Sequence, residues 1–281
     1  MSGLSPEAIA TAYQACCLAE LDALKPGNVH VFGDGHRMAV ADFVTSAEIS
    51  APHLAEPGAR IGRRVRTAME ATLGAVGQNT NLGILLLCAP LARAAENGGP
   101  LRAALSHALD DLDAADATDV FAAIRAANPG GLGRVERHDV TESVAPASLV
   151  AAMAEAAPRD RIARAYVTDF ADIFGIGLPA LAAARGKGLT PPWSTTAVFL
   201  GYLAAVPDSH VARKHGPDRA DALRAEAAEL LSLDLATHPV TELLARDRSW
   251  KGQNLNPGTS ADMTVATLFA DRLLAAGMEQ P

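Results

Sequence analysis

Residues 254–269, NLNPGTSADMTVATLF, join a polar loop to an apolar pattern of helical spacing. Pro257 and Gly258 end one segment, and Thr259 is expected to cap the next helix, with Asp262 three residues further on. A cap of this kind satisfies backbone N–H groups at the start of a helix and is common in helical proteins. The chain repeats the arrangement several times, which indicates a helical scaffold that carries functional loops.

The composition favours helix over sheet along all 281 residues. Ala dominates and aromatic residues make up only 4%, and Ala loses least on entering a helix while β-branched and aromatic residues favour strands. Apolar residues recur at helical spacing, and no period-two pattern of useful length predicts a strand. The helical spacing covers residues 9–24, 40–49, 61–76, 82–95, 101–112, 120–127, 148–156, 161–184, 194–205, 220–233, 239–245 and 260–276. We therefore expect a single compact all-α domain spanning residues 1–281.

Charge, hydropathy and cysteine usage exclude several classes of protein. The formal charge is −8 and the chain has no long basic run, which argues against a nucleic-acid partner. The most apolar runs, 82–92 and 197–206, have roughly half the length of a bilayer span, and the N-terminal segment has the pattern of a helix start, not of a signal peptide. Cys16, Cys17 and Cys88 lack the spacing of a disulfide framework or a zinc site, so we expect small buried hydrophobes. A cytoplasmic protein without a membrane partner is expected.

Five connections carry more polar groups than a turn between helices needs. Polar groups gathered on loops that a rigid scaffold holds are typical of a binding site. The sequence has neither a P-loop, nor a dinucleotide fingerprint after a strand, nor a nucleophile elbow. The connections are KPGNVHVFGDGHRM (25–38), GQNTNLG (77–83), NPGGLGRVERHDV (128–140), PDSHVARKHG (207–216) and NLNPGTSAD (254–262).

The first connection is only partly explained as the end of a helix. That interpretation accounts for Lys25 and Gly27, but not for Asn28, His30 and His36 following so closely. Lys25 can place a positive charge on a phosphate chain, and the two histidines can bind phosphate oxygens or act as acid–base groups. A zinc site is less well supported, because neither HxH nor HExxH spacing is present.

The second and third connections each leave two interpretations open. Asn79 and Thr80 either cap the apolar helix that follows or sit where its free N–H groups meet a phosphate. Gly131 lies in a glycine-rich run followed by arginines. This run is either a flexible loop or a place where backbone N–H groups approach phosphate. On the expected helix 161–184, Asp169 and Asp172 share a face, either as solvated charges or as a face half turned to the core.

The fourth and fifth connections combine carboxylates with cations. Arg213 and Lys214 form either a solvated helix end or a cluster that holds a triphosphate, with Asp208 holding the accompanying divalent ion. Asp262, at the head of the last helix, is either a capping residue or a second metal carboxylate. Ser260 lies at the same helix start and is a candidate phosphate ligand.

Taken in order, five short motifs resemble those of the triphosphoribosyl-dephospho-CoA synthase family. They are KPGNVH (25–30), GHRM (35–38), Ser46-Ala47, NTNLG (79–83) and NPGTSAD (256–262). The resemblance spans nearly the whole chain. It implies an all-α transferase in cofactor biosynthesis that uses ATP, accompanied by Mg²⁺, as the donor. A hydroxyl of dephospho-CoA would displace adenine from C1 of the ribose, and the product would carry the triphosphoribosyl group.

The reaction implied by this resemblance assigns tasks to the candidate residues. The triphosphate must be neutralised, the leaving adenine must be protonated or hydrogen-bonded, and the oxocarbenium-like ribose must be stabilised. The candidate ligands for ATP and its phosphates are Lys25, Gly27, Asn28, His36, Thr80, Gly131, Arg213, Lys214 and Ser260. The candidate catalytic residues are Asp208, Asp262, Asn79 and His30, of which the first two are also candidate Mg²⁺ ligands.

The chain departs from the family pattern inside these motifs. Asn81 and Leu82 replace the His and Lys of an NTHKG-like loop, Arg37 replaces an Asp, and residues 213–216 and 256–259 replace Arg-Gly-Gly and SPGG. Two alternatives therefore stay open. One is a related ribosyl or phosphoribosyl transfer to another cofactor precursor, such as a methanopterin-type pterin, and the other is a non-catalytic nucleotide- or CoA-binding protein. The acceptor, the general base and the oligomeric state, including a homodimer, are not determined by the sequence.

Overall fold

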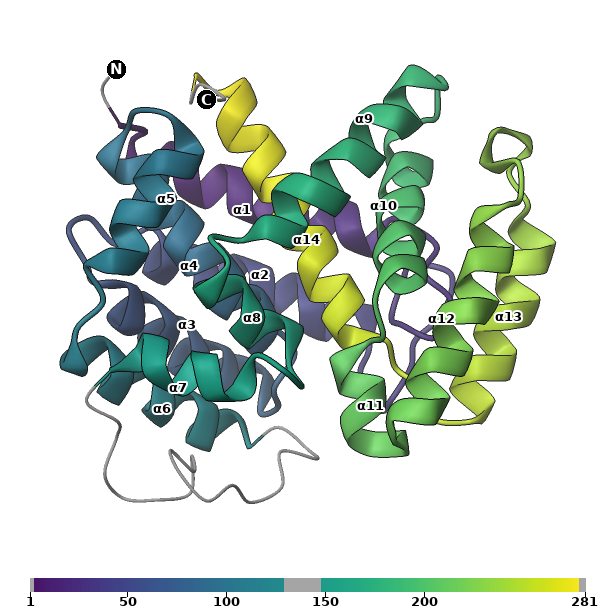
Figure 1. Ribbon diagram of the computed structural model, residues 1–281, viewed down its shortest axis with the longest axis horizontal. Coiled ribbons are helices and arrows are strands. Elements are labelled where there is room, and N and C mark those ends of the chain that lie inside the picture. The colour runs from purple at the N-terminus through teal and green to yellow at the C-terminus, as the bar shows by residue number, and fades with distance from the viewer. Residues whose placement is uncertain (1–2, 129–147, 278–281) are drawn as a thin grey trace. The chain divides into compact units, whose positions relative to one another are not determined.

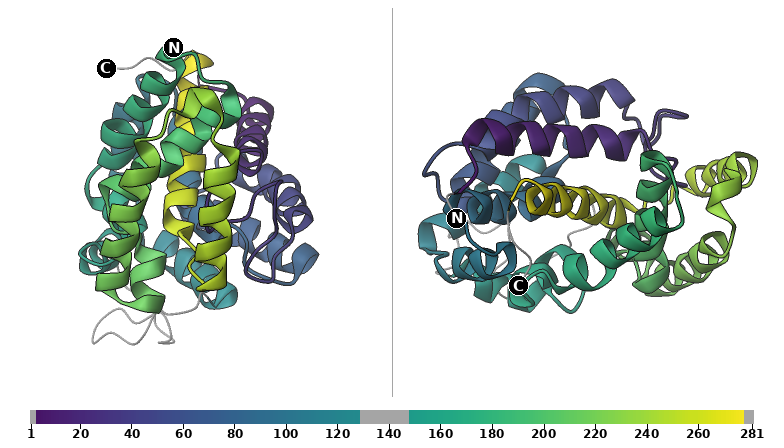
Figure 2. Two further views of the ribbon diagram at one scale, coloured as in Figure 1. Left: turned by 90° about the vertical axis from the view of Figure 1, so that its right-hand side faces the viewer. Right: turned by 90° about the horizontal axis from the view of Figure 1, so that it is seen from above.

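Helices account for nearly all regular structure in the computed structural model, which describes residues 3–128 and 148–277 (Figure 1). The described residues form fourteen α-helices, one π-helical turn and one 3-10 turn. They contain two isolated β-bridges, His30 with Gly33 and Gly35 with Met38, and no strand is drawn among them in either view of Figure 2. The expected all-α class is confirmed.

The chain divides into two compact units, each assembled from segments far apart in the sequence. Unit 1 contains Met1–Ala15, Val44–Phe170 and Phe269–Pro281, and unit 2 contains Cys16–Phe43 and Ala171–Leu268. Three helices contribute residues to both units, namely α1 (Pro6–Leu21), α2 (Val40–Leu54) and α14 (Gly258–Ala275). The expectation of one domain stays a prediction.

Unit 1 is built around the apolar helix that the sequence predicts over 82–95. Leu85, Leu87 and Leu91 on this helix have no solvent exposure, as expected for a helix that is apolar on all sides. Helix α3 packs against α4 and α6. A Cβ at Gly62 would lie 2.5 Å from the Asp116 carbonyl oxygen, so only glycine permits this approach. The helices lying wholly in unit 1 are α3 (Ile61–Val76), α4 (Leu82–Asn97), α5 (Leu101–Asp110), α6 (Ala114–Ala127), α7 (Leu149–Ala156) and α8 (Arg161–Val167).

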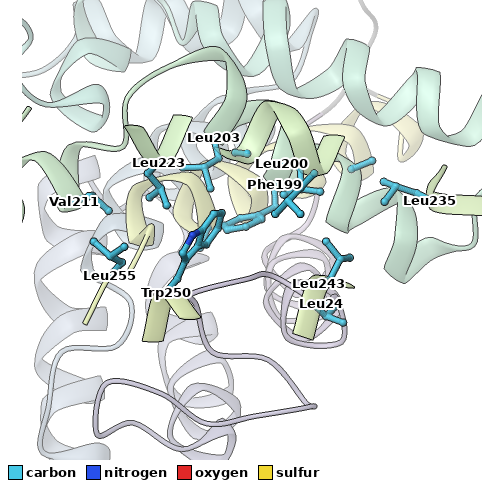
Figure 3. Close-up of a cluster of buried hydrophobic side chains, with 14 of the residues drawn as sticks. Leu24, Phe199, Leu200, Leu203, Val211, Leu223, Leu235, Leu243, Trp250 and Leu255 are labelled. Atoms are coloured by element: carbon cyan, nitrogen blue, oxygen red, sulfur yellow. The ribbon is translucent and has the colours of Figure 1, made fainter. Parts of the chain in front are cut away.

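Unit 2 has its own hydrophobic core around Trp250 (Figure 3). Trp250 and Phe199 are fully buried in it, and the Trp250 indole N–H donates to Glu226 Oε2 over 2.7 Å. Helix α10 packs against α9 and α12. The elements lying wholly in unit 2 are the π turn (Ile173–Gly177), α9 (Leu178–Gly186), α10 (Pro191–Ala205), α11 (Ser209–His215), α12 (Pro217–Leu231), the 3-10 turn (Leu235–Thr237) and α13 (Val240–Gly252).

The prediction of one continuous helix over 161–184 is wrong. Helix α8 ends at Val167, and Asp169 and Phe170 follow with φ of 48° and 56°. The chain leaves the helix here because Phe170 is fully buried, and tertiary packing overrides local propensity. Asp169 and Asp172 therefore do not share a face of one helix.

Smaller differences concern the loops and helix ends. The fourth connection contains a helix of its own, α11, whose first turn is capped by the Asp208 carboxylate. Helix α14 begins at Gly258, so Thr259 lies inside its first turn and is not its cap. The Thr259 hydroxyl accepts the backbone N–H of His210 over 3.2 Å, which gives it a partner on another helix.

Two expectations about side chains and hydropathy can be compared with the structure. Cys16, Cys17 and Cys88 are buried, as expected. Within residues 3–128 and 148–277, no helix combines the length and hydropathy that crossing a bilayer requires.

Candidate functional site

The predicted site residues fall into two polar clusters, one in each unit. Asn79 and Thr80 lie in unit 1, and Gly131 lies outside the described residues. All other predicted residues belong to unit 2, on the segment 25–38, on α11 and at the start of α14. The unit 2 cluster thus brings three of the five polar connections together.

The first connection turns sharply at Gly27, in a backbone conformation that favours glycine. Its φ is +81°, and a Cβ would lie 3.0 Å from Pro257 Cδ and 3.2 Å from both Leu255 O and Trp250 Cε3. Only glycine combines this backbone conformation with so little space. The Gly27 N–H donates to Asp247 Oδ1 over 2.9 Å, so the turn is fixed against α13.

Asn28 connects the same turn to the loop before α14. Its side-chain amide donates to Asn256 Oδ1 over 2.8 Å, and its own Oδ1 accepts the N–H of Val29 over 2.9 Å. Both asparagines are buried. Asn28 therefore joins two motifs that are 228 residues apart, and its role as a phosphate ligand stays a prediction.

Lys25 forms an ion pair inside the protein. Its ammonium has no solvent exposure, lies 2.8 Å from Glu20 Oε1 and donates to the Val29 carbonyl over 2.5 Å. Burial lowers the pKa of Lys25 and raises the pKa of Glu20, and the attraction between the two charges opposes both shifts. This arrangement shapes the loop that follows α1, and contact of Lys25 with phosphate stays a prediction.

His30 is also enclosed. Its Nδ1 accepts the N–H of Phe32 over 3.2 Å, so the proton of the neutral ring lies on Nε2. Nε2 is 3.4 Å from Asp247 Oδ1. Burial lowers the pKa of His30 and outweighs the neighbouring Asp247 carboxylate, which raises it. His30 has no solvent exposure, and its catalytic role stays a prediction.

His36 occupies a tight turn at the far end of the first connection. His36 and Arg37 have φ of 57° and 64°, and Gly35 and Met38 pair across them. The His36 Nε2–H donates to the Gly27 carbonyl over 2.8 Å, because a carbonyl oxygen can only accept. Positive φ at two consecutive non-glycine residues is the geometry of a type I′ hairpin turn.

Asp208 binds four donors and does not fit a Mg²⁺ ligand. Oδ1 accepts the N–H groups of His210 and Val211, and Oδ2 accepts the N–H and the hydroxyl of Ser260, each over 2.8 Å. Burial raises the pKa of Asp208, against the hydrogen bonds, which lower it. The carboxylate therefore holds the starts of α11 and α14 together, and the N–H of Ser260 points to it and not to a phosphate.

The rest of unit 2 supplies no cluster of three metal-ligating side chains either. Among residues 3–128 and 148–277, no three His, Cys, Asp or Glu side chains lie close enough to hold a metal ion. Asp262 is partly buried one turn into α14 and makes contacts of its own. Its role as a metal or catalytic carboxylate stays a prediction.

Positive and protonatable groups gather around His210. Its ring lies over the start of α14, since a Cβ on Gly258 would be 3.1 Å from Nδ1. Burial lowers its pKa to about 3, helped by Lys214, Arg213, His36 and His215, in that order. Burial and Arg213 also lower the pKa of Lys214. We call His36, His210, Arg213, Lys214 and His215 the cation cluster.

The cluster in unit 1 is a buried network of neutral groups. The Thr80 hydroxyl lies 2.5 Å from that of Ser46, so two of the motifs behind the family resemblance meet here. The Asn81 amide donates to Thr72 Oγ1 over 3.1 Å, and its Oδ1 has no hydrogen-bond partner in the described part of the chain. The Asn79 Oδ1 accepts the N–H of Leu82, the first residue of α4, over 3.1 Å, while the N-cap position itself is occupied by Asn81.

Sequence reasoning missed the partners that α1 and α13 provide. Glu20 pairs with Lys25, Asp247 contacts Gly27 and lies beside His30, and Lys251 lies 3.1 Å from Asp247 Oδ2. The spacing of Asp247 and Lys251, four residues apart, is a usable signal because such residues face each other on a helix. The expected helix ends at residue 245 and does not include this pair.

Comparisons with known proteins agree with this architecture. No curated protein sequence matches the chain significantly. A crystal structure from Archaeoglobus fulgidus, described as a candidate triphosphoribosyl-dephospho-CoA synthase, has 22% identity and a TM-score of 0.62, covering 83% of this chain and 99% of that one. At this identity, the likeness establishes the fold. The family profile described as ATP:dephospho-CoA triphosphoribosyl transferase matches residues 6–280. The chain therefore belongs to the ATP:dephospho-CoA triphosphoribosyl transferase family.

Proposed function

We propose that the protein transfers the triphosphoribosyl group of ATP to dephospho-CoA with release of adenine, and that the cation cluster binds the triphosphate. Membership of the family supports the reaction. The observation that supports the site is the gathering of the cation cluster around His210, whose pKa is lowered to about 3 by burial and by these neighbours.

Arg213 and Lys214 place two positive charges close together, and a bound anion offsets the repulsion between them. Like charges close together disfavour the charged form of each group, and the charge of Arg213 adds to the effect of burial in lowering the pKa of Lys214. A triphosphate removes this repulsion and accepts charge-assisted hydrogen bonds from Arg213 and Lys214. The side chain of Lys214 is exposed and that of Arg213 is partly exposed, so both can reach a ligand, in contrast to the enclosed Lys25.

The neighbouring loops hold this cluster in place. His36 is fixed by its bond to Gly27, and His215 Nε2 lies 3.1 Å from the Asn254 carbonyl. Asp208 anchors the start of α11 to Ser260 on α14. Preorganised charges of this kind hold the triphosphate of the transferred group without reorganisation during the reaction. We assign adenine departure and proton removal from the acceptor to no single side chain, and Asp262 is the first candidate to test.

We propose that Mg²⁺ enters as part of the ATP complex. Mg²⁺ is commonly held by substrate phosphates and waters with only one or two carboxylates. Asp208, with four donors on its oxygens, is not one of those carboxylates. In this proposal the metal ion is a component of the substrate.

Kinetics of neutral variants test the assignment of the triphosphate site. Arg213→Gln and Lys214→Gln should each raise the KM for ATP about tenfold, because a hydrogen bond to a charged group contributes roughly 1.5–3 kcal/mol. Arg224→Gln is the matched control, since Arg224 is exposed on α12 and pairs with Asp221. An unchanged KM for ATP in both cluster variants would remove the cation cluster from the triphosphate site.

A further inference from the structure

Asp247 on α13 makes contacts that a solvent-facing helix carboxylate would not make. It is 5% exposed. Its Oδ1 accepts the Gly27 N–H over 2.9 Å and lies 3.4 Å from His30 Nε2, while its Oδ2 lies 3.1 Å from Lys251 Nζ. Burial alone would raise its pKa, but His30, the Gly27 N–H and Lys251 together hold it below its usual value. Asp247 is therefore an ionised, enclosed carboxylate with three separate partners.

The first partner, Gly27, links Asp247 to the cation cluster through two hydrogen bonds. The N–H of Gly27 is held by Asp247, and its carbonyl accepts the Nε2–H of His36 over 2.8 Å. Gly27 cannot shift easily, because Pro257, Leu255 and Trp250 surround it within 3.2 Å of a built Cβ. One residue thus connects the α13 carboxylate to a histidine of the cation cluster.

The other two partners, His30 and Lys251, hold the segment 30–35. The proton of the neutral His30 ring lies on Nε2, 3.4 Å from Asp247 Oδ1, because its Nδ1 accepts the Phe32 N–H. Lys251 donates to the Gly33 carbonyl over 3.0 Å, and its Cε would lie 2.9 Å from a Cβ on Gly35. The carboxylate therefore lies beside both side chains that brace residues 30–35, and its charge offsets that of the Lys251 ammonium.

We propose that Asp247 is a positioning residue for ATP: without touching the substrate, it sets the place of His36 in the cation cluster through Gly27. This inference rests on the proposed function, which supplies the ligand. Asp247 is not part of any of the five polar connections, and its three partners lie on the first connection or on its own helix. Its effect on the ligand is therefore indirect.

Asp247→Asn separates positioning from folding. The amide keeps one acceptor for the Gly27 N–H but presents an NH₂ group where Oδ2 faced the Lys251 ammonium. We expect the KM for ATP to rise about tenfold with kcat within about twofold, the size of one lost charge-assisted contact. Loss of folded protein alone would lower the apparent kcat and leave KM unchanged. Asp221→Asn, an exposed acid on α12 paired with Arg224, is the control and should match the wild type.

Lys251→Met is a second variant if Asp247→Asn does not fold. It removes the ammonium that links Asp247 to Gly33, on a side chain that is partly exposed. We expect a smaller rise in KM, about threefold, again with little change in kcat. A wild-type KM in whichever of the two variants folds would overturn the proposal.

An NMR measurement tests the same claim without activity. In ¹⁵N-histidine-labelled wild type, His30 should carry its proton on Nε2, and Asp247→Asn should shift the ring signals of both His30 and His36. Unchanged His36 signals would overturn the proposal even if the enzyme is active. If the wild type releases no adenine but both histidines respond, the proposed function fails and the coupling through Asp247 stands.

Discussion

Lys25 and His30 have side chains suited to a phosphate site, and Asp208 has one suited to the accompanying metal ion, but each is enclosed and contacts other protein groups. Arg213 and Lys214 are more exposed. A buried charged group needs partners within the protein, or its desolvation disfavours the charged form. The same motifs therefore contain residues that hold the loops and residues that can meet a ligand, and only burial in the folded chain separates the two.

Asp262 is the residue whose role a single substitution decides. If it acts on the substrate, Asp262→Asn should lower kcat at least about 100-fold, the range of acid–base contributions. The melting temperature should stay within about 2 °C, since one exchanged carboxylate oxygen changes little packing. Asp218→Asn, in the first turn of α12, is the matched control. Wild-type turnover with a lowered melting temperature would identify Asp262 as a structural residue.

His210 should make the stability of the protein depend on pH. Its folded-state pKa of about 3 lies below the ordinary 6.5, so the unfolded chain takes up a proton first as the pH falls. The stability that His210 contributes is present above about pH 6.5 and is lost progressively toward pH 3. Between pH 7 and pH 5 the loss is about 2 kcal/mol in the free energy of unfolding.

Urea unfolding at several pH values measures this contribution. Between pH 7 and pH 5, the free energy of unfolding should decrease by about 2 kcal/mol less in His210→Gln than in the wild type. His238→Gln, at an exposed position after the 3-10 turn, should leave the decrease as it is. The same slope in His210→Gln and in the wild type would mean that the ring is not held neutral.

At the level of the elements, the π turn before α9 depends on one glycine. A Cβ at Gly177 would lie 2.2 Å from both Thr267 Oγ1 and Tyr202 OH, whereas a Cβ at Gly175 in the same turn meets nothing within 4 Å. Gly177→Ala should therefore destabilise unit 2 by about 3 kcal/mol through overpacking. Gly175→Ala should change the unfolding free energy by less than about 1 kcal/mol. Equal effects in urea unfolding would show that the contact at Gly177 is not tight.

Helix positions follow from the sequence where one helix side is apolar along its length. The expected segments 61–76, 82–95 and 101–112 agree with α3, α4 and α5 within two residues at each end. The sequence pattern does not predict the break after Val167, because the burial of Phe170 outweighs the helical spacing of apolar residues. Helix α11 is seven residues long and mostly polar, so it lacks the repeat on which periodicity depends.

The candidate site could be predicted as a set of loops but not as a network. The sequence identifies the motifs because polar groups are concentrated in connections between helices. It does not identify Asp247, which accepts a hydrogen bond from a residue 220 positions away. It also does not indicate that Ser260, 52 positions away, donates to the Asp208 carboxylate. Such pairings depend on tertiary packing, and only the folded chain separates a capping carboxylate from a metal ligand.

At the level of the whole molecule, an acidic protein binds an acidic substrate. The formal charge is −8, so the attraction to ATP depends on the local cation cluster and should be sensitive to salt. The KM for ATP should rise several-fold between about 50 and 300 mM NaCl. In the double variant Arg213→Gln/Lys214→Gln the KM should be high at both salt concentrations and nearly constant. An equal salt dependence in both proteins would place the attraction elsewhere.

The central claim is the transfer itself, and mass spectrometry of a single reaction tests it most directly. Purified protein is incubated with ATP, Mg²⁺ and dephospho-CoA, and free adenine and the triphosphoribosyl adduct are quantified together. The account predicts both products in a one-to-one ratio, with neither formed when the protein is left out. Adenine without the adduct would contradict dephospho-CoA as the acceptor, and the absence of both products would contradict the transfer from ATP.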